Sequence, residues 1–345
     1  MNAAPYKGGG MEKAMIGKQD RILIREQLER LLGVWEGRNG CRIEDCMPEE
    51  IFACFSNFGK VFVRDGLKKK MELTADSTIR LEILQYNSSA ANDRAWQHAI
   101  ILGLIGQAGS HVCFGGTFVN ELVRTGGKWL FEKLRFELQS DDGFSKMYLT
   151  EQGHIIAIPG KGDRTLMTGW KMVNDRIGYF MDPVKEQGNH MILGEKDAPW
   201  NCVDKPEDDK DDVECIREVF DRFCFAYDFS TLMLMKDILT DDVVIHTPNA
   251  GNLNKHDALG YFRLLRQGSP RSFLAGKMTA PRIDNNTAAC RIVCYAPEYY
   301  LAREAGGTEN WYDVCTYGSL ALRFRKEEGN WMISEAEWIG DHYEK

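Results

Sequence analysis

The sequence carries one pattern of secondary-structure signals twice, and this repeat constrains the fold more than any other feature. Residues 20–35 and 212–227 each place apolar side chains at helical spacing between charged ones, which predicts an amphipathic helix at the start of each copy. The triplets Ile24-Arg25-Glu26 and Ile216-Arg217-Glu218 match residue for residue and lie 192 residues apart. We therefore expect two divergent copies of one domain.

The segments that follow the two opening helices keep one order. A second short helix and a strand are predicted in each copy, and a polar turn then leads into a long strand rich in β-branched and aromatic residues. The short helix and strand are expected at 49–55 and 60–64 in the first copy and at 231–239 and 243–247 in the second, and the long strands at 96–104 and 289–296.

Each copy ends in a predicted β-hairpin. The first hairpin joins strands at 111–124 and 129–138 through Gly126-Gly127, and the second joins strands at 313–325 and 331–339 through Glu328-Gly329. Glycine favours the left-handed backbone that tight hairpin turns require. Helices and antiparallel strands in this order predict an α+β class for both copies.

We predict four segments from this pattern. They are a flexible N-terminus (1–19), copy one (20–140), a connecting segment with short strands (141–211) and copy two (212–345). The connecting segment is too apolar for a flexible linker. It is expected to form a β-rich unit that packs across one or both domains, with candidate strands at 154–158 and 176–180.

The charge distribution excludes two classes of partner. The net charge of −8 is spread along the chain, apart from an acidic run at 207–212, and Lys and Arg form no basic face in the predicted elements. Nucleic acids and anionic membrane surfaces require clustered basic residues. We therefore expect neither a nucleic acid nor a membrane as a partner.

The cysteine pattern and the apolar runs predict a cytoplasmic protein without a metal site. None of the ten cysteines forms a Cys-x-x-Cys pair or a Cys/His spacing typical of zinc. The first ten residues lack the apolar core of a signal peptide, and no apolar run reaches membrane-spanning length. We expect buried, reduced cysteines, no metal and no other cofactor.

Three segments of the second copy carry a resemblance to a known family. Phe223-Cys-Phe-Ala-Tyr-Asp228, Leu239-Thr-Asp-Asp-Val-Val-Ile and Glu328-Gly-Asn-Trp-Met-Ile resemble the opening helices, first strand and final hairpin of the SnoaL-like branch of the nuclear transport factor two-like superfamily. Copy one resembles it in element order more than in residues. The resemblance implies two cone-shaped domains, each a curved, mostly antiparallel sheet wrapped around helices.

The family fold implies a deep apolar pocket for a small hydrophobic ligand. Relatives include isomerases, dehydratases and cyclases as well as members without catalysis, so the fold alone does not select an activity. One hypothesis is a cofactor-independent lyase or isomerase. The alternative is a non-catalytic ligand-binding protein with one degenerate domain. Because relatives dimerise through the outer sheet face, the resemblance also implies either a homodimer or an intramolecular pseudo-dimer.

Three residues are candidates for acid/base catalysis, which requires a carboxylate or imidazole close to the reacting atoms. Asp65 ends the predicted strand at 60–64, where isomerase-like relatives have their base, and an apolar setting there would raise its pKa. His98 lies on the first long strand, and Asp228 corresponds to an acid of dehydratase-like relatives. Each of the three also has a purely structural interpretation. Asp65 would lie in a solvated turn at the end of the strand, His98 would be a histidine packed in the wall of the cavity, and Asp228 would cap a turn at the end of its helix.

The candidate ligand-binding residues are expected to line the two pockets. In copy two, Phe223 and Thr247 occupy positions where the family pattern has a tyrosine and an aspartate, so this copy lacks the expected reactive groups. We therefore expect any activity in one domain rather than in both. The full set of candidates is Trp35, Glu36, Phe223, Tyr227, Thr247, Tyr295 and Tyr317.

Overall fold

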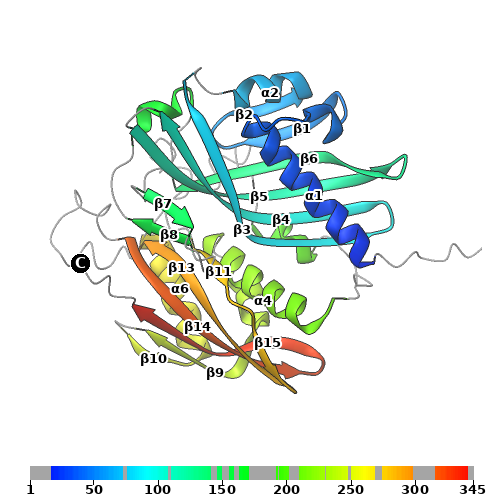
Figure 1. Cartoon of the computed structure of the whole chain (residues 1–345). Coiled ribbons are helices and arrows are strands. Elements are labelled where there is room, and N and C mark those ends of the chain that lie inside the picture. Colours follow the sequence, from blue (N-terminus) through cyan, green and yellow to red (C-terminus); the bar gives the residue numbers. More distant parts are fainter. Residues whose placement is uncertain are drawn as a thin grey trace, which may run out of the picture.

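The computed structural model describes residues 17–340, except for 73–75, 108–109, 141–145, 150–154, 159–162, 171–191, 193, 202–209, 230, 248–249, 269–273 and 298–314. The predicted flexible N-terminus up to residue 16 and the predicted strand at 176–180 lie outside the described residues. The chain forms two α+β domains, each a curved sheet with its helices (Figure 1). No helix in the described part is long and apolar enough to cross a membrane.

Domain one contains a six-stranded sheet in the order β2-β1-β6-β5-β4-β3. Strands β1 and β6 pair in parallel, and all other neighbours are antiparallel. Its elements are α1 (Lys18–Trp35), β1 (Glu50–Phe55), β2 (Gly59–Val63), α2 (Arg64–Met71), β3 (Thr78–Ala91), β4 (Arg94–Gln107), β5 (Ser110–Thr125) and β6 (Lys128–Ser140).

Domain two repeats this topology, in the order β10-β9-β15-β14-β13-β11, again with one parallel pair, β9 and β15. A short strand, β12, also pairs with β13. Its elements are α4 (Asp212–Asp228), α5 (Leu232–Asp237), β9 (Leu239–Thr247), β10 (Gly251–Leu253), α6 (Lys255–Gly268), β11 (Ala275–Met278), β12 (Arg282–Asp284), β13 (Thr287–Pro297), β14 (Cys315–Glu327) and β15 (Asn330–Gly340). The matching strand orders confirm the predicted tandem α+β architecture.

Local sequence signals explain where several elements begin and turn. Asp211 caps α4: its side chain accepts a hydrogen bond from the Glu214 backbone N–H, while the Glu214 side chain accepts one from the Asp211 backbone, a capping box. Both predicted hairpin turns occur. Gly126-Gly127 and Glu328-Gly329 all have positive φ, as hairpin turns of this kind require.

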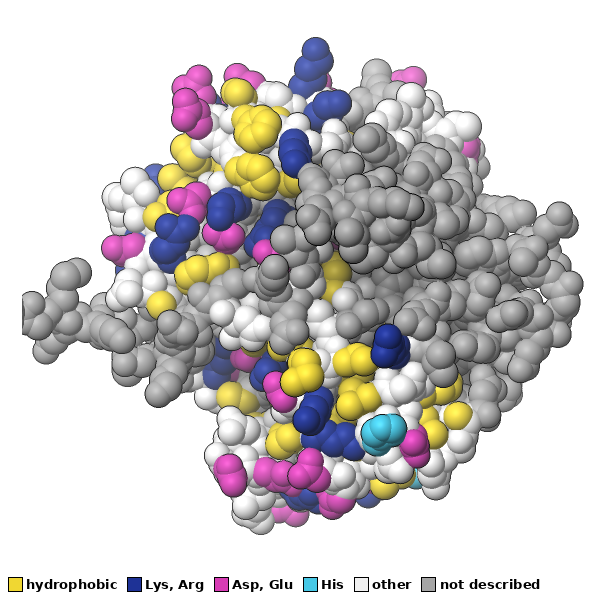
Figure 2. Space-filling view, turned by 180° about the vertical axis from the view of Figure 1, so that it is seen from behind, with side chains coloured by type: hydrophobic (Ala, Val, Ile, Leu, Met, Phe, Trp, Pro, Cys, Tyr) yellow, Lys and Arg dark blue, Asp and Glu magenta, His cyan; other side chains and the backbone are white. Residues whose placement is uncertain are grey.

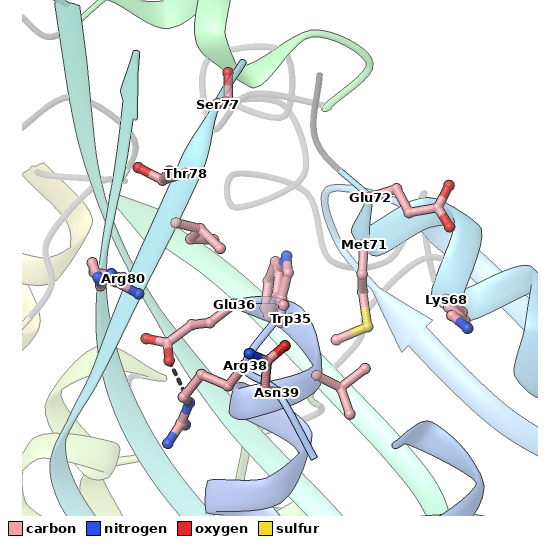
Figure 3. A pocket seen from close by; sticks show the side chains of 13 residues that line it. Trp35, Glu36, Arg38, Asn39, Lys68, Met71, Glu72, Ser77, Thr78 and Arg80 are labelled. Carbon is pink, nitrogen blue, oxygen red and sulfur yellow. Dashed lines mark ion pairs between the residues drawn. The ribbon is translucent and has the colours of Figure 1, made fainter. Parts of the chain in front are cut away.

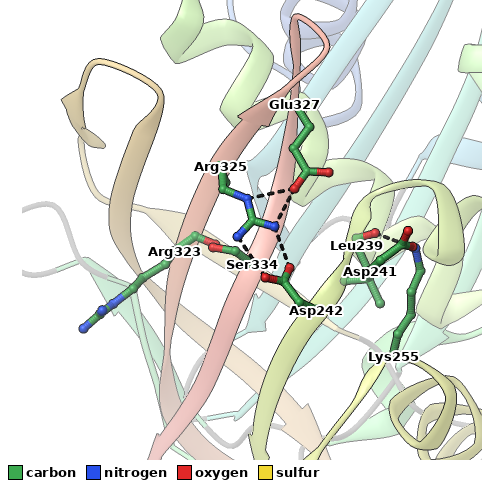
Figure 4. A network of polar contacts seen from close by, with 8 residues as sticks. All are labelled: Leu239, Asp241, Asp242, Lys255, Arg323, Arg325, Glu327 and Ser334. Carbon is green, nitrogen blue, oxygen red and sulfur yellow. Dashed lines mark hydrogen bonds and ion pairs between the residues drawn. The ribbon is translucent and has the colours of Figure 1, made fainter.

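Polar contacts also join strands within domain two (Figure 4). Arg325 on β14 donates hydrogen bonds to both carboxylate oxygens of Asp242 on β9, at 3.1 and 2.5 Å, and it also pairs with Glu327. Lys255, at the start of α6, donates to the carbonyl of Leu239 at 2.7 Å and to Asp241 at 3.0 Å. These bonds hold β14 and α6 to β9.

The predicted helix at 49–55 is wrong, because this segment forms strand β1. Ile51, Ala53 and Phe55 are buried, and β1 pairs in parallel with β6. Pairing with β6 makes this apolar segment a strand, in which successive side chains point to opposite faces of the sheet. The helix of domain one comes later, because α2 follows β2 directly. In domain two the predicted helix at 231–239 does form, as α5.

The strand β4 is buried on both faces, which places its side chains in two different cores. Ala99 and Ile101 belong to the core of domain one, whereas Ile100 and Leu102 belong to a cluster formed mainly by domain two. A strand that is covered on both faces has a nearly continuous apolar sequence, and residues 99–105 of β4 have such a sequence. The outer face of the first sheet is therefore an interdomain surface.

Polar contacts between described residues also link the domains. Arg21 on α1 pairs with Glu214 on α4 at 3.0 Å, and Glu82 on β3 pairs with Lys277 on β11 at 3.3 Å. The amide of Gln85 donates a hydrogen bond to the Cys224 sulfur at 3.0 Å. On the side of the molecule seen in Figure 2, acidic and basic side chains of the described residues are interspersed.

Part of the connecting segment completes the core of domain one. Strands β7 (Lys146–Leu149) and β8 (Ile155–Ile158) form a small hairpin. The 3-10 helix η2 (Arg164–Met167) follows. Leu166, Met167 and Trp170 are buried in the core of domain one. A later 3-10 helix, η5 (Pro199–Asn201), carries Trp200 to the domain boundary.

Candidate functional site

A pocket of about 680 Å³ lies at one end of domain one. Three segments line it: the end of α1 with the turn that follows (34–39), the end of α2 (Lys68, Met71 and Glu72), and the chain entering β3 (77–80). Figure 3 shows α2 and β3 on opposite sides of this space, with Trp35 between them. We call it the α1–α2 pocket.

The end of α1 is shaped by a glycine turn. Gly37 has φ +67°, and the backbone N–H of Arg38 donates a hydrogen bond to the Gly33 carbonyl at 2.8 Å. A left-handed glycine after the last helical residues is a common way to satisfy the final carbonyls. This turn reverses the chain and brings Glu36 and Arg38 to the pocket wall.

Trp35 is the buried base of the pocket. Its side chain is 3% exposed, and its ring packs against Phe55, Phe58, Phe114 and Phe136, with ring centroids 5.8 to 6.2 Å apart. The indole N–H faces the space between β3 and α2 (Figure 3) and has no hydrogen-bond acceptor among the described residues. A buried donor without an acceptor is costly.

Glu36 and Arg38 form an ion pair without net charge at the pocket wall. One Glu36 oxygen accepts a hydrogen bond from the Leu81 backbone N–H at 2.6 Å, and the other pairs with Arg38 at 2.6 Å. The Glu36 side chain is 7% exposed. Both carboxylate oxygens are therefore engaged, and the two charges cancel.

Three more charged residues border the pocket: Lys68 and Glu72 on α2, and Arg80 on β3. All three are exposed to solvent. Figure 3 shows Lys68 and Arg80 on opposite sides of the space.

Asp65 is not in the apolar setting expected from the sequence. It lies in the first turn of α2, and its side chain is 79% exposed. The reason is that the chain enters α2 immediately after β2, so Asp65 does not continue the alternation of the strand. The prediction that Asp65 ends a strand facing the pocket is wrong.

His98 lies on the outer face of the first sheet, between the domains. Its ring packs against Trp200 and Phe225, with centroids 5.6 and 5.3 Å away. Neither ring nitrogen has a hydrogen-bond partner among the described residues. Complete burial lowers its pKa to about 3, because the charged form loses hydration. Its setting is an apolar interface rather than the α1–α2 pocket.

Asp228 holds the chain in domain two. It is the last residue of α4 and is 1% exposed, and its Oδ1 atom accepts a hydrogen bond from the Leu274 backbone N–H at 2.9 Å. This bond ties the end of α4 to the segment entering β11. No described hydrogen bond or ion pair joins Asp65, His98 and Asp228 to one another.

The predicted ligand-binding residues separate into groups. Trp35 and Glu36 line the α1–α2 pocket. Phe223 and Tyr227 are buried in domain two, where both rings contact Phe262. The Thr247 hydroxyl donates to the Gly251 carbonyl at 3.1 Å and so closes the turn between β9 and β10. The side chains of Tyr295 and Tyr317 lie outside the described residues.

Sequence reasoning did not identify Lys68 and Arg80 as pocket residues. Lys68 lies in a basic helix end and Arg80 in an alternating strand, and both patterns are typical of ordinary solvated surfaces. Within the described residues, no three His, Cys, Asp or Glu side chains form a group that could hold a metal ion.

The fold defines this chain as a tandem α+β protein, with a small-molecule-sized pocket at the end of its first domain. No family model matches the sequence, and no curated protein matches it either. Several solved structures match over a part of the chain about one domain long.

The Kfla4162 protein from Kribbella flavida is 15% identical, covers 36% of this chain and 94% of its own, and has a TM-score of 0.33. An NTF2-like protein from Cytophaga hutchinsonii is 14% identical, covers 38% and 99%, and has a TM-score of 0.30. A type 2 hexachlorocyclohexane dehydrochlorinase (LinA) is 15% identical, covers 36% and 87%, and has a TM-score of 0.31. These matches include NTF2-like proteins and an enzyme, and they do not indicate a specific activity.

Proposed function

We propose that this protein binds a small molecule in the α1–α2 pocket without transforming it. The observation that carries the proposal is the pocket at the end of α1, with both oxygens of its Glu36 carboxylate engaged by other groups. The pocket volume of about 680 Å³ suits an ordinary small organic ligand.

The competing proposal is the cofactor-independent lyase or isomerase. One observation favours it: Glu36 is a buried carboxylate at the pocket wall. A general base needs a free oxygen near the proton that it removes. Both Glu36 oxygens are engaged, and Glu72 is exposed to solvent. The binding proposal is therefore the better supported of the two.

The test fills the pocket. Thr78→Trp places a large ring at the exposed side of the pocket. Thr125→Trp is the matched control, because Thr125 is an exposed threonine of domain one that does not line the pocket. Native mass spectrometry of gently purified protein should show a bound compound in the parent and in the control, and about tenfold less in Thr78→Trp, while circular dichroism checks that both variants are folded.

Incubation of the isolated compound with the protein separates the two proposals. Binding without change in its mass or isomer composition supports the binding protein. Conversion that is lost in Glu36→Gln or Glu72→Gln would replace it with the lyase or isomerase. Equal retention of the compound by Thr78→Trp and the parent would move the site away from this pocket.

We also propose that the two domains act as an intramolecular pseudo-dimer in the cytoplasm. The outer face of the first sheet already packs against α4 of domain two, and the buried Cys46 and Cys290 are in no disulfide, as in reducing compartments. Sedimentation should give a 39.3 kDa monomer. A stable dimer at low micromolar concentration would contradict the intramolecular pseudo-dimer. Cell fractionation tests the location, and recovery of the protein outside the cytoplasmic fraction would contradict it.

A further inference from the structure

The contact between the two domains contains buried polar atoms as well as apolar side chains. Helix α4 lies between the two sheets (Figure 1), and Phe225 on α4 packs against His98 on β4. Neither ring nitrogen of His98 has a hydrogen-bond partner among the described residues. The same is true of the side-chain oxygens of Gln85 and Asn87 and of the indole nitrogen of Trp200.

These atoms gather where the first sheet meets domain two. Asn87 lies directly opposite His98 in the β3–β4 pair, so both side chains point to the same face of the sheet. Gln85, two residues earlier, points to this face as well, and its amide donates a hydrogen bond to the Cys224 sulfur on α4 at 3.0 Å. The Trp200 ring packs against His98, with centroids 5.6 Å apart.

The unpartnered atoms favour separation of the domains. A buried donor or acceptor without a partner has lost its hydrogen bonds to water, and it regains them when the two surfaces part. The apolar contact that opposes separation is limited. Among the described residues, the buried side chains that domain one contributes to the shared cluster are Cys54, Ile100, Leu102 and Val119. Modest interdomain contacts of mixed polarity commonly permit relative domain motion.

Separation would leave a hydrophobic core in each domain. All buried residues in the core of domain one come from residues 24–170. Apart from the four side chains of domain one, the buried residues of the shared cluster come from residues 192–336. Neither core needs the other domain to surround it, so the interface can open at a lower free energy than global unfolding requires.

We propose that the contact between the domains is a latch that opens reversibly while both domains stay folded. In the closed form, the ion pairs Arg21–Glu214 and Glu82–Lys277 hold α1 and β3 to domain two. In the open form, water reaches His98 and the other unpartnered atoms. This inference rests on the proposed pseudo-dimer, which sedimentation tests separately, and it needs no ligand in the α1–α2 pocket.

Cysteine labelling followed by peptide mass spectrometry tests the latch in the parent protein. Cys224 is buried at the interface, whereas Cys46 is buried in the core of domain one and Cys290 in domain two. In native buffer, N-ethylmaleimide should modify Cys224 at least about tenfold faster than the other two, because opening exposes only Cys224 among them. Equal rates for all three would overturn the proposal, since the interface would then open only on global unfolding.

Two substitutions should shift the latch in opposite directions. His98→Leu removes two unpartnered nitrogens and keeps an apolar side chain, so it should slow the labelling of Cys224 about tenfold. Arg21→Met removes an ion pair between the domains and should speed this labelling about tenfold. Circular dichroism checks that each variant is folded. The parent rates and Arg21→Met decide the question if His98→Leu does not fold.

His246→Leu is the matched control for His98→Leu. His246 lies on β9, and both of its ring nitrogens have partners within domain two, Asn252 at 2.7 Å and Glu335 at 3.3 Å. This control should label Cys224 at the parent rate. An unchanged Cys224 rate in folded His98→Leu, or in Arg21→Met, would overturn the proposal.

Discussion

The carboxylate of Asp212 accepts a hydrogen bond from the indole N–H of Trp331 at 2.8 Å. Domain one contains the same relationship between Asp20 and Trp129, at 3.2 Å. In each domain a cation of the final hairpin joins the pair: Lys326 in domain two and Arg124 in domain one. The start of each opening helix is thus tied to the end of its domain, and the repeat is preserved in side-chain contacts as well as in topology.

Replacing Asp212 with Asn should make stability less dependent on acid pH. Hydrogen bonds from Lys326 and then Trp331 lower the pKa of Asp212 in the folded protein. A carboxyl whose pKa is lowered by folding stabilises the protein above its unfolded pKa, and this stability is lost as the pH falls through the folded value. The parent should therefore lose its advantage over Asp212→Asn below about pH 4.

Urea unfolding at pH 6, 4 and 3 measures this difference. Asp237→Asn serves as the control, because Asp237 is exposed at the end of α5 and should show no comparable change. A difference between the parent and Asp212→Asn that stayed constant across these pH values would contradict the prediction.

Replacing Arg21 with Met should weaken the contact between the domains. The Arg21 side chain is 9% exposed and that of its partner Glu214 is 29% exposed, so this ion pair is shielded from water more than most surface pairs. Losing one partner leaves the other charge partly buried, at a cost of about 1–3 kcal/mol in the free energy of unfolding. Urea denaturation measures the loss.

Arg42→Met provides the comparison for Arg21. Arg42 also faces carboxylates, but its side chain is 68% exposed, and exposed pairs contribute about 0–1 kcal/mol. Equal losses in the free energy of unfolding for the two substitutions would show that burial does not strengthen the Arg21–Glu214 pair.

Replacing His98 with Leu should protect the protein against mild acid. Burial lowers the pKa of His98 to about 3, whereas an unfolded histidine has a pKa near 6.5. Between these values the unfolded chain binds a proton that the folded protein does not, so stability falls as the pH decreases. Above about pH 6.5 both states are neutral, and this effect disappears.

The free energy of unfolding of His98→Leu should gain on that of the parent by about 1.4 kcal/mol per pH unit between pH 6 and pH 4. Thermal and urea unfolding at several pH values measure this slope. His256→Gln is the control, because His256 has a 97% exposed side chain. Parallel pH profiles for His98→Leu and the parent would argue against the buried, unpaired setting of His98.

Replacing Gly116 with Ala should destabilise domain one. A Cβ atom at Gly116 would lie 2.4 Å from the Phe136 ring and 2.7 Å from the Glu137 carbonyl oxygen. The backbone oxygen has no room to move within the β5–β6 pair, and overpacking of this kind costs about 1–3 kcal/mol. Differential scanning calorimetry should show a lower Tm.

Gly106→Ala is the matched control on the adjacent strand β4. Its Cβ atom would meet nothing closer than 3.9 Å, so we expect a change within about 0.5 kcal/mol. A loss at Gly106 as large as that at Gly116 would mean that the effect comes from glycine flexibility rather than from steric contact.

Part of the fold follows from local signals in the sequence. The apolar spacing at residues 20–35 predicts α1, and the turn pairs Gly126-Gly127 and Glu328-Gly329 predict both final hairpins, because helix periodicity and turn chemistry are properties of a few adjacent residues. Sequence patterns predict a helix at 49–55, but the segment is a strand. Its apolar run suits either state, and only its pairing with β6 makes it a strand.

The residues of the candidate site are likewise only partly predictable from the sequence. Trp35 and Glu36 could be marked from the sequence because they end an amphipathic helix, and both line the α1–α2 pocket. Lys68 and Arg80 join them there only through the packing of α2 and β3 around the end of α1. The expected position of Asp65 assumes that the strand continues, whereas the chain turns into α2 at Arg64.

Two copies of an α+β domain can be predicted from the sequence, because helix periodicity and turn residues depend on neighbours along the chain. Which segments cover each face of a sheet follows only from how the folded chain packs. On β4, alternation separates Ala99 from His98, but nothing local shows that α4 and Trp200 cover the outer side. Burial depends on the surface that packs against a residue, and that surface comes from segments a hundred residues away along the chain.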